Sequence, residues 1–131
     1  MDKTIEVVFP GGKEVDGKIE NMIIKTDQPV KDGGEGSAPE PFQLFLMSIA
    51  TCAGIYALDF CQAREIETKD MTLTMNCEFD PSGRVCQKLS IDLRVPAGFP
   101  EKYKKAIVRT MDLCTVKKHI MNPPEFEIKT S

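Results

Sequence analysis

The fold is decided by residues 41–64, which read PFQLFLMSIATCAGIYALDFCQAR. Apolar side chains occupy most helical positions of this stretch, so it lacks the polar face that a helix presents to water. Glu40 stands where an N-cap belongs, Pro41 lies in the first turn, and Gln43 can reach back to the cap in a capping box. The sequence therefore predicts a long helix, buried on all sides, that spans roughly 36 Å if it ends at Arg64.

The same stretch carries enough polar residues to argue against a membrane span. Gln43, Ser48, Thr51 and Asp59 interrupt it, which suits the core helix of a folded domain better. The N-terminus is charged from Asp2 onward and has no apolar signal segment, so we expect a cytoplasmic protein with reduced thiols. The formal net charge of −3 provides no basic surface for nucleic acid. Neither a nucleic-acid nor a membrane partner is expected.

Strands and shorter helices are expected on both sides of the long helix. Three short strands precede it, at residues 5–9, 15–19 and 22–26. A glycine-rich loop at 31–37 follows them and lacks the Gly-Lys-Ser/Thr of a phosphate-binding loop. After the long helix come a hairpin at residues 71–95, a helix that opens at residues 100–102, a break with a fresh helix start at 112–116, the end of that helix at 119–121 and a final strand at 125–129. This order has no regular βαβ repetition, so we predict one α+β domain over residues 1–131 with antiparallel sheets.

The hairpin is expected to turn at residues 80–83, a type I turn sequence with glycine in fourth position. Two registers are open: a two-residue loop sets Cys77 directly opposite Cys86, and a one-residue bulge at Gly83 pairs Cys77 with Gln87. The bulged register gathers the apolar side chains on one face, and burial therefore favours it. It predicts that Cys77 points inward, that Cys86 points outward and that the two are not bonded.

The five cysteines show no Cys-x-x-Cys spacing, so neither a zinc site nor a disulfide framework is expected. Cys61 fits a small core residue. Cys52 has small neighbours, including Gly54, which costs a helix interior about 1 kcal/mol relative to alanine. A close backbone approach or a ligand would explain that cost, although a core role for Cys52 is equally open. Cys114 lies at a helix start, where free N–H groups and the helix dipole stabilise a thiolate; Cys52, about three turns into its helix, receives little of that help.

A family resemblance rests on two cysteine motifs. Residues 38–52, APEPFQLFLMSIATC, resemble the start of the central helix in the OsmC/Ohr family, where an apolar run ends in small residues and a cysteine. Cys114-Thr115-Val116 resembles the second cysteine motif of that family, which begins a short helix. With the order of elements, the resemblance covers nearly the whole chain. It implies an OsmC-like fold in which two long buried central helices are wrapped by antiparallel sheets in an intertwined homodimer.

The resemblance also implies a chemistry. The best-known members reduce organic hydroperoxides with a cysteine pair, so Cys52 would be the peroxidatic cysteine and Cys114 the resolving one. A dithiol reductant would be the further partner, and neither a cofactor nor a metal is expected. The peroxidases of the family also use an arginine near the N-terminus and a glutamate about ten residues before the first cysteine. Here no arginine precedes Arg64, Phe42 and Gln43 occupy the helix positions in question, and a lysine near the N-terminus would have to replace the arginine.

Two functions from different classes follow. The first is thiol-dependent reduction of organic hydroperoxides in oxidative-stress defence, with an alkyl group held near Cys52 by residues such as Phe45, Ile49, Ile55 and Tyr56. The second is a non-enzymatic OsmC-like dimer that binds a small hydrophobic molecule. The only histidine, His119, is interpreted as a surface or interface residue, because it lies one turn beyond Cys114.

Overall fold

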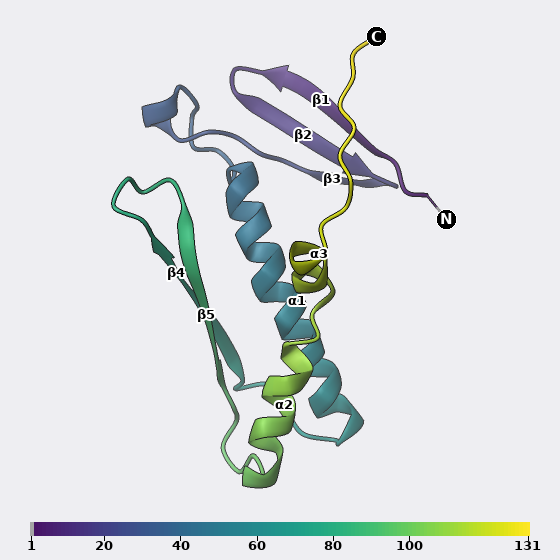
Figure 1. Cartoon of the computed structure of the whole chain (residues 1–131), viewed down its shortest axis with the longest axis vertical. Helices are drawn as coiled ribbons and strands as arrows, with labels where there is room; N and C mark the ends of the chain where they lie inside the picture. The colour runs from purple at the N-terminus through teal and green to yellow at the C-terminus, as the bar shows by residue number, and fades with distance from the viewer. Residues whose placement is uncertain (1) are drawn as a thin grey trace. The chain divides into compact units, whose positions relative to one another are not determined.

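The computed structural model describes residues 2–131, and Met1 lies outside the described part. The chain forms two compact units, residues 1–47 and 48–131, and each is described by itself. Three strands precede a long helix, and a hairpin and two shorter helices follow it, in the predicted order and without a βαβ repeat (Figure 1).

The first unit contains a three-stranded antiparallel sheet in the order β1-β2-β3. Its strands are β1 (Ile5–Gly11), β2 (Glu14–Ile19) and β3 (Met22–Ile24), which confirms the three predicted strands. The β1–β2 turn passes through Gly12 at φ 56°, a left-handed conformation that glycine adopts without strain. Several large apolar side chains of the sheet are exposed: Ile5, Val7, Phe9, Met22, Ile23 and Ile24.

The loop after β3 is organised by the buried carboxylate of Asp27, only 1% of whose surface is exposed. This carboxylate accepts hydrogen bonds from the backbone N–H groups of Gln28, Glu35 and Ser37 and from the Ser37 hydroxyl. Gly34 permits this path, because a Cβ at that position would lie 2.0 Å from the Gln28 carbonyl oxygen. One short 3₁₀ turn, η1 (Val30–Asp32), lies within the loop.

The long helix α1 spans Pro41–Ala63, close to the predicted bounds. The predicted capping box is confirmed, since the Glu40 N–H donates to Gln43 Oε1 at 3.0 Å. The expectation of burial on all sides is wrong for the single chain. Only one face is buried, because the chain covers α1 along one stripe: Ile49, Ala53, Ala57, Phe60 and Cys61. By length and hydropathy α1 could also cross a membrane, but a core helix meets the same criteria, and its buried stripe belongs to the core of the second unit.

The second unit combines this part of α1 with a hairpin and short helices. The hairpin strands are β4 (Thr72–Phe79) and β5 (Cys86–Arg94). A 3₁₀ turn, η2 (Glu101–Tyr103), leads into α2 (Lys104–Met111), and α3 (Thr115–Met121) follows a break, as predicted. The core lies where α1, α2 and the chain around Phe99 pack together, with Ile107 and Cys61 fully buried.

The hairpin register differs from the predicted one. The turn forms as expected, with the Gly83 N–H donating to the Asp80 carbonyl at 2.9 Å, but Cys77 pairs with Leu89 rather than Gln87. The irregularity lies beside Phe79, which pairs with Cys86, and not at Gly83. The side chains along β4 keep the predicted face because the slip is two residues. Beyond the irregularity the prediction for Cys86 is wrong: it lies on the same face as Cys77, although the two are free thiols as expected.

The predicted final strand at 125–129 is not formed. Residues 123–131 have no regular secondary structure, and Phe126 and Ile128 are 82% and 91% exposed. A strand needs a neighbour to share its backbone hydrogen bonds, and no strand in residues 2–131 pairs with this segment.

Candidate functional site: a thiol pair beside an apolar pocket

Cys52 and Cys114 lie side by side in the second unit. Cys52 is on α1, and Cys114 is the N-cap residue of α3. The two sulfurs are within hydrogen-bonding reach, with the Cys114 thiol as donor to Cys52. The structure thus brings together the two cysteines that the sequence singled out.

The backbone N–H groups at the start of α3 stabilise the thiolate of Cys52 rather than that of Cys114. Burial raises the pKa of Cys52, but the hydrogen bond from Cys114 and the backbone N–H groups of Val116 and Thr115 outweigh it and leave that pKa below the ordinary value. The expectation that Cys52 receives little help from a helix start is therefore wrong. Its own helix gives none, but the first N–H groups of a second helix are directed at its sulfur.

The pKa of Cys114 is raised, whereas the sequence predicts a stabilised thiolate at this position. Its side chain is 2% exposed, and burial together with the adjacent Cys52 raises the pKa of Cys114 despite the N–H groups of Lys117 and Val116. The hydrogen bond between the thiols favours one ionised state, in which Cys52 carries the charge and Cys114 keeps its proton. A nucleophilic thiolate beside a neutral thiol results.

A hydrogen bond between side chains ties α3 to α1 next to this pair. The Tyr56 hydroxyl lies 2.9 Å from Thr115 Oγ1. Tyr56 is one helical turn beyond Cys52, and Thr115 directly follows Cys114. This contact holds the start of α3 close to the turn of α1 that carries Cys52.

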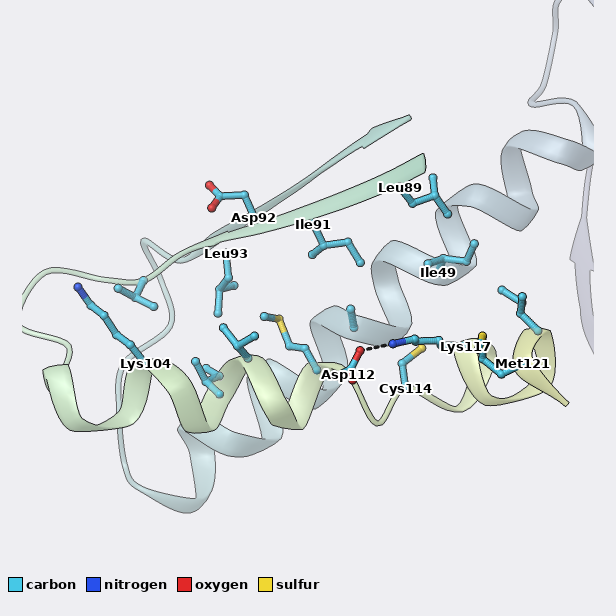
Figure 2. A pocket seen from close by; sticks show the side chains of 16 residues that line it. Ile49, Leu89, Ile91, Asp92, Leu93, Lys104, Asp112, Cys114, Lys117 and Met121 are labelled. Carbon is cyan, nitrogen blue, oxygen red and sulfur yellow. Dashed lines mark hydrogen bonds and ion pairs between the residues drawn. The ribbon is translucent and has the colours of Figure 1, made fainter. Parts of the chain in front are cut away.

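A pocket of about 670 Å³ opens beside Cys114 (Figure 2). Its wall is mainly aliphatic and comes from α1, β5 and α2: Ile49, Ala53, Leu89, Ile91, Leu93, Ile107 and Met111. Lys117 forms an ion pair with Asp112 next to Cys114, so its positive charge is already balanced. Of the residues expected to hold an alkyl group, only Ile49 lines this pocket.

Several site residues were missed from the sequence. The sequence predicts Tyr56 only as an apolar contact, and it predicts that the amide groups at the helix start stabilise Cys114. Their position directly after a cysteine at a helix start was a visible signal, but the sequence does not show which sulfur the helix start faces.

The other cysteine and histidine predictions are simpler. Cys61 is fully buried in the core, which confirms its structural role, and burial raises the pKa of its thiol. His119 is exposed, as expected, and its Nδ1 lies 2.7 Å from the Thr115 carbonyl oxygen. Within residues 2–131 no three His, Cys, Asp or Glu side chains gather as metal ligands would.

Comparison with known proteins agrees with this architecture. The family described as OsmC-like protein matches residues 34–129, which include both cysteines. The chain belongs to the OsmC-like family. No curated protein matches its sequence.

Solved structures of OsmC-like proteins share the fold. An osmotic stress induced and detoxification response protein from Psychrobacter arcticus 273-4 is 24% identical, with a TM-score of 0.75, over 88% of this chain and 85% of that one. The organic hydroperoxide resistance protein OsmC from Legionella pneumophila is 20% identical, with a TM-score of 0.60, over 92% of this chain and 89% of that one. A Vibrio cholerae structure described with an organic hydroperoxide resistance function, and with captopril in one active site, is 20% identical, with a TM-score of 0.58, over 92% and 85% of the two chains. At these identities the likeness supports the OsmC-like fold of this chain.

Proposed function

We propose that this protein reduces organic hydroperoxides with Cys52 as the attacking thiolate and Cys114 as the resolving thiol. The observation that carries the proposal is the asymmetry of the pair. Cys52 has a lowered pKa and Cys114 a raised one, and an apolar pocket is lined by Cys114 and by Ile49 and Ala53, which flank Cys52 on α1. The description of two similar structures as organic hydroperoxide resistance proteins supports the same chemistry.

The first step is attack of the Cys52 thiolate on the terminal oxygen of the hydroperoxide. The O–O bond breaks, the leaving alkoxide takes from water a proton equivalent to the one that Cys52 gave up on ionisation and departs as an alcohol, and Cys52 becomes a sulfenic acid. The sulfur loses two electrons, which reduce the peroxide. The aliphatic wall around Ile49 and Ile107 favours an alkyl hydroperoxide over hydrogen peroxide, because only the alkyl group removes apolar surface from water on binding.

The second step is attack of Cys114 on the sulfenic sulfur of Cys52. Cys114 loses its proton, the sulfenic oxygen leaves as water, and a Cys52–Cys114 disulfide forms. An external dithiol then reduces this disulfide by thiol–disulfide exchange and restores both thiols. A disulfide needs adjacent sulfurs, and the interaction of the Cys114 thiol with Cys52 supports this step.

A turnover assay with a small dithiol and an aromatic or alkyl hydroperoxide tests the proposal. Wild type should consume the organic hydroperoxide faster than hydrogen peroxide, and Cys52→Ser should abolish consumption. Cys114→Ser should complete one oxidation and then stop at the sulfenic acid, which a dimedone-type reagent traps. Cys61→Ser, which alters a buried cysteine of the core, is the matched control. Peroxide consumption by Cys52→Ser at the wild-type rate would refute the assignment.

A second candidate function rests on the pocket alone. A pocket of about 670 Å³ with an aliphatic wall is large enough for a small hydrophobic molecule. Lys117 near Cys114 is ion-paired with Asp112, so it supplies no uncompensated positive charge to a thiolate, and this favours a binding function. If wild type consumes no hydroperoxide and binds an apolar dye competitively with alkyl alcohols, the binding function replaces the enzymatic one.

We also infer that the protein acts as an intertwined homodimer in the cytoplasm. Exposed apolar side chains on the β1–β3 sheet, on α1 and in the C-terminal segment support a partner of the same chain. Five free cysteines suit a reducing compartment.

A further inference from the structure

The corrected hairpin register places two further cysteines together. Cys77 pairs with Leu89, and Phe79, the next residue on the same face of β4, pairs with Cys86. The irregularity between these two pairs adds one residue on β5. Cys77 and Cys86 are therefore near neighbours on the same face of the hairpin, close to its turn. Both are free thiols and both are partly exposed, so a small reagent can reach them.

We propose that Cys77 and Cys86 form a second redox site, which takes low-molecular-weight disulfides as oxidants and closes to a cross-strand disulfide. This site is separate in sequence and in position from the Cys52–Cys114 pair. It does not depend on the proposed peroxidase function, because its oxidant is a disulfide and not a peroxide.

The reaction has two exchange steps. In the first, the thiolate of Cys86 attacks a sulfur of the small disulfide, the S–S bond breaks, and one small thiol leaves with the proton that Cys86 gave up. In the second, Cys77 loses its proton, attacks the Cys86 sulfur and releases the second small thiol. Two protein thiols are oxidised to one disulfide, and the small disulfide is reduced to two thiols.

The order of attack follows from the surroundings of the two sulfurs. Burial and the neighbouring Cys86 thiol raise the pKa of Cys77, so a smaller part of Cys77 is thiolate at neutral pH. The Cys86 thiol lies nearer the turn and is partly exposed, so a small disulfide can reach it. Cys86 therefore attacks first, and Cys77 closes the bond.

The turn holds the two sulfurs near each other. The Asp80 carboxylate accepts hydrogen bonds from the Ser82 hydroxyl and from the N–H groups of Arg84 and Val85. The Asp80 N–H donates to the Val85 carbonyl at 2.9 Å, which closes the end of the ladder next to Cys86. A rigid turn of this kind raises the effective concentration of one thiol at the other.

The test uses glutathione disulfide on a Cys52→Ser/Cys114→Ser background, so that a failure of the peroxidase proposal leaves the result unchanged. Two thiols should disappear without net addition of glutathione. Trypsin cleaves after Arg84, so a Cys77–Cys86 disulfide joins two tryptic peptides that are otherwise separate. Adding Cys77→Ser should leave glutathione on Cys86, whereas adding Cys86→Ser should slow its addition to Cys77 several-fold. Adding Cys61→Ser is the control and should change nothing.

If the Cys52→Ser/Cys114→Ser variant folds poorly, the same peptide mapping is done on wild-type protein oxidised with glutathione disulfide. Joined peptides containing Cys77 and Cys86 are the expected result in both proteins. Accumulation of glutathione on both cysteines without closure would overturn the proposal, as would two thiols that remain free while circular dichroism reports a native fold.

Discussion

Cys52 lies in the middle of a helix, yet its sulfur faces the first amide groups of another helix. The Cys114 thiol and the N–H groups of Val116 and Thr115 outweigh the effect of burial and lower its pKa. Amide dipoles and a neutral thiol stabilise a thiolate without adding a full positive charge. Slow but real peroxidase activity is therefore the expected consequence at the scale of single residues.

The ionisation of the pair gives a first prediction. The rate of alkylation of Cys52 should rise with pH around a midpoint below that of an ordinary cysteine, because its thiolate is stabilised. Cys114→Ala removes a hydrogen-bond donor to that thiolate and should move the midpoint upward. Iodoacetamide labelling across a pH series, read by tandem mass spectrometry at Cys52, measures both. An unchanged midpoint in Cys114→Ala would mean that the two thiols do not interact.

The Tyr56–Thr115 hydrogen bond gives a second prediction. Tyr56→Phe should slow closure of the Cys52–Cys114 disulfide by a few-fold to tenfold, because a typical hydrogen bond contributes about 0.5–1.5 kcal/mol. Stopped-flow measurement of thiol loss after a stoichiometric hydroperoxide pulse separates this step from the first oxidation. Tyr103→Phe is the matched control, since Tyr103 packs against Phe60 and Phe99 and lies outside the thiol pair. Equal rates in the two variants would remove Tyr56 from the positioning of the pair.

At the scale of elements, the Asp27 loop gives a third prediction. Four hydrogen bonds to its carboxylate, led by the Ser37 hydroxyl, lower the pKa of Asp27 from 3.8 to about 2. A lowered carboxyl pKa stabilises the fold fully above about pH 3.8, and the contribution is lost as the pH falls through about 2. Asp27→Asn should therefore lower the Tm by several degrees at neutral pH, and its difference from wild type should shrink below pH 3.8.

Thermal unfolding monitored by circular dichroism between pH 7 and pH 2 measures that difference. The control is Asp32→Asn, in the same loop, because Asp32 is exposed. A constant difference between Asp27→Asn and wild type down to pH 2 would contradict the assigned role of the charge.

The elements also show what the sequence could predict. Apolar spacing and turn residues were sufficient for the three N-terminal strands, the capping box of α1 and the break before α3. The hairpin register could not be predicted from the apolar pattern, because a slip of two residues leaves the side chains of β4 on the same face. Periodicity therefore identified the buried face of Met75 and Cys77 but not their partners. The thiol pair was found through its two motifs, whereas the direction of the α3 amides depends on tertiary packing.

At the scale of the whole molecule, the uncovered apolar surface leads to a fourth prediction. Phe126 and Ile128 alternate with acidic residues, as in a strand, but have no ladder partner among residues 2–131. We expect a stable homodimer at micromolar concentration in sedimentation equilibrium, with this segment paired to the second copy. Replacing Phe126 and Ile128 with serine should weaken the dimer at least tenfold, because each large apolar side chain contributes about 1.5–3 kcal/mol when buried.

The matched control replaces Glu125 and Glu127, which lie on the other side of the same segment, with serine. This variant should remain as dimeric as wild type. A wild-type protein that sediments as a monomer at micromolar concentration would contradict both the dimer and the expected cover for the exposed face of α1.

The central claim is that Cys52 and Cys114 form one redox pair, and peptide mapping after one equivalent of an organic hydroperoxide tests it most directly. Cleavage after Arg64, Arg109 and Lys117 puts the two cysteines on different tryptic peptides, and a disulfide joins them. The peptide with Cys52 also carries Cys61, so tandem mass spectrometry must assign the bonded sulfur. The account predicts loss of two thiols and a Cys52–Cys114 bond in wild type, with no such bond in Cys52→Ser. Full retention of both thiols while the hydroperoxide is present, or a bond that joins Cys114 to another cysteine, would contradict it.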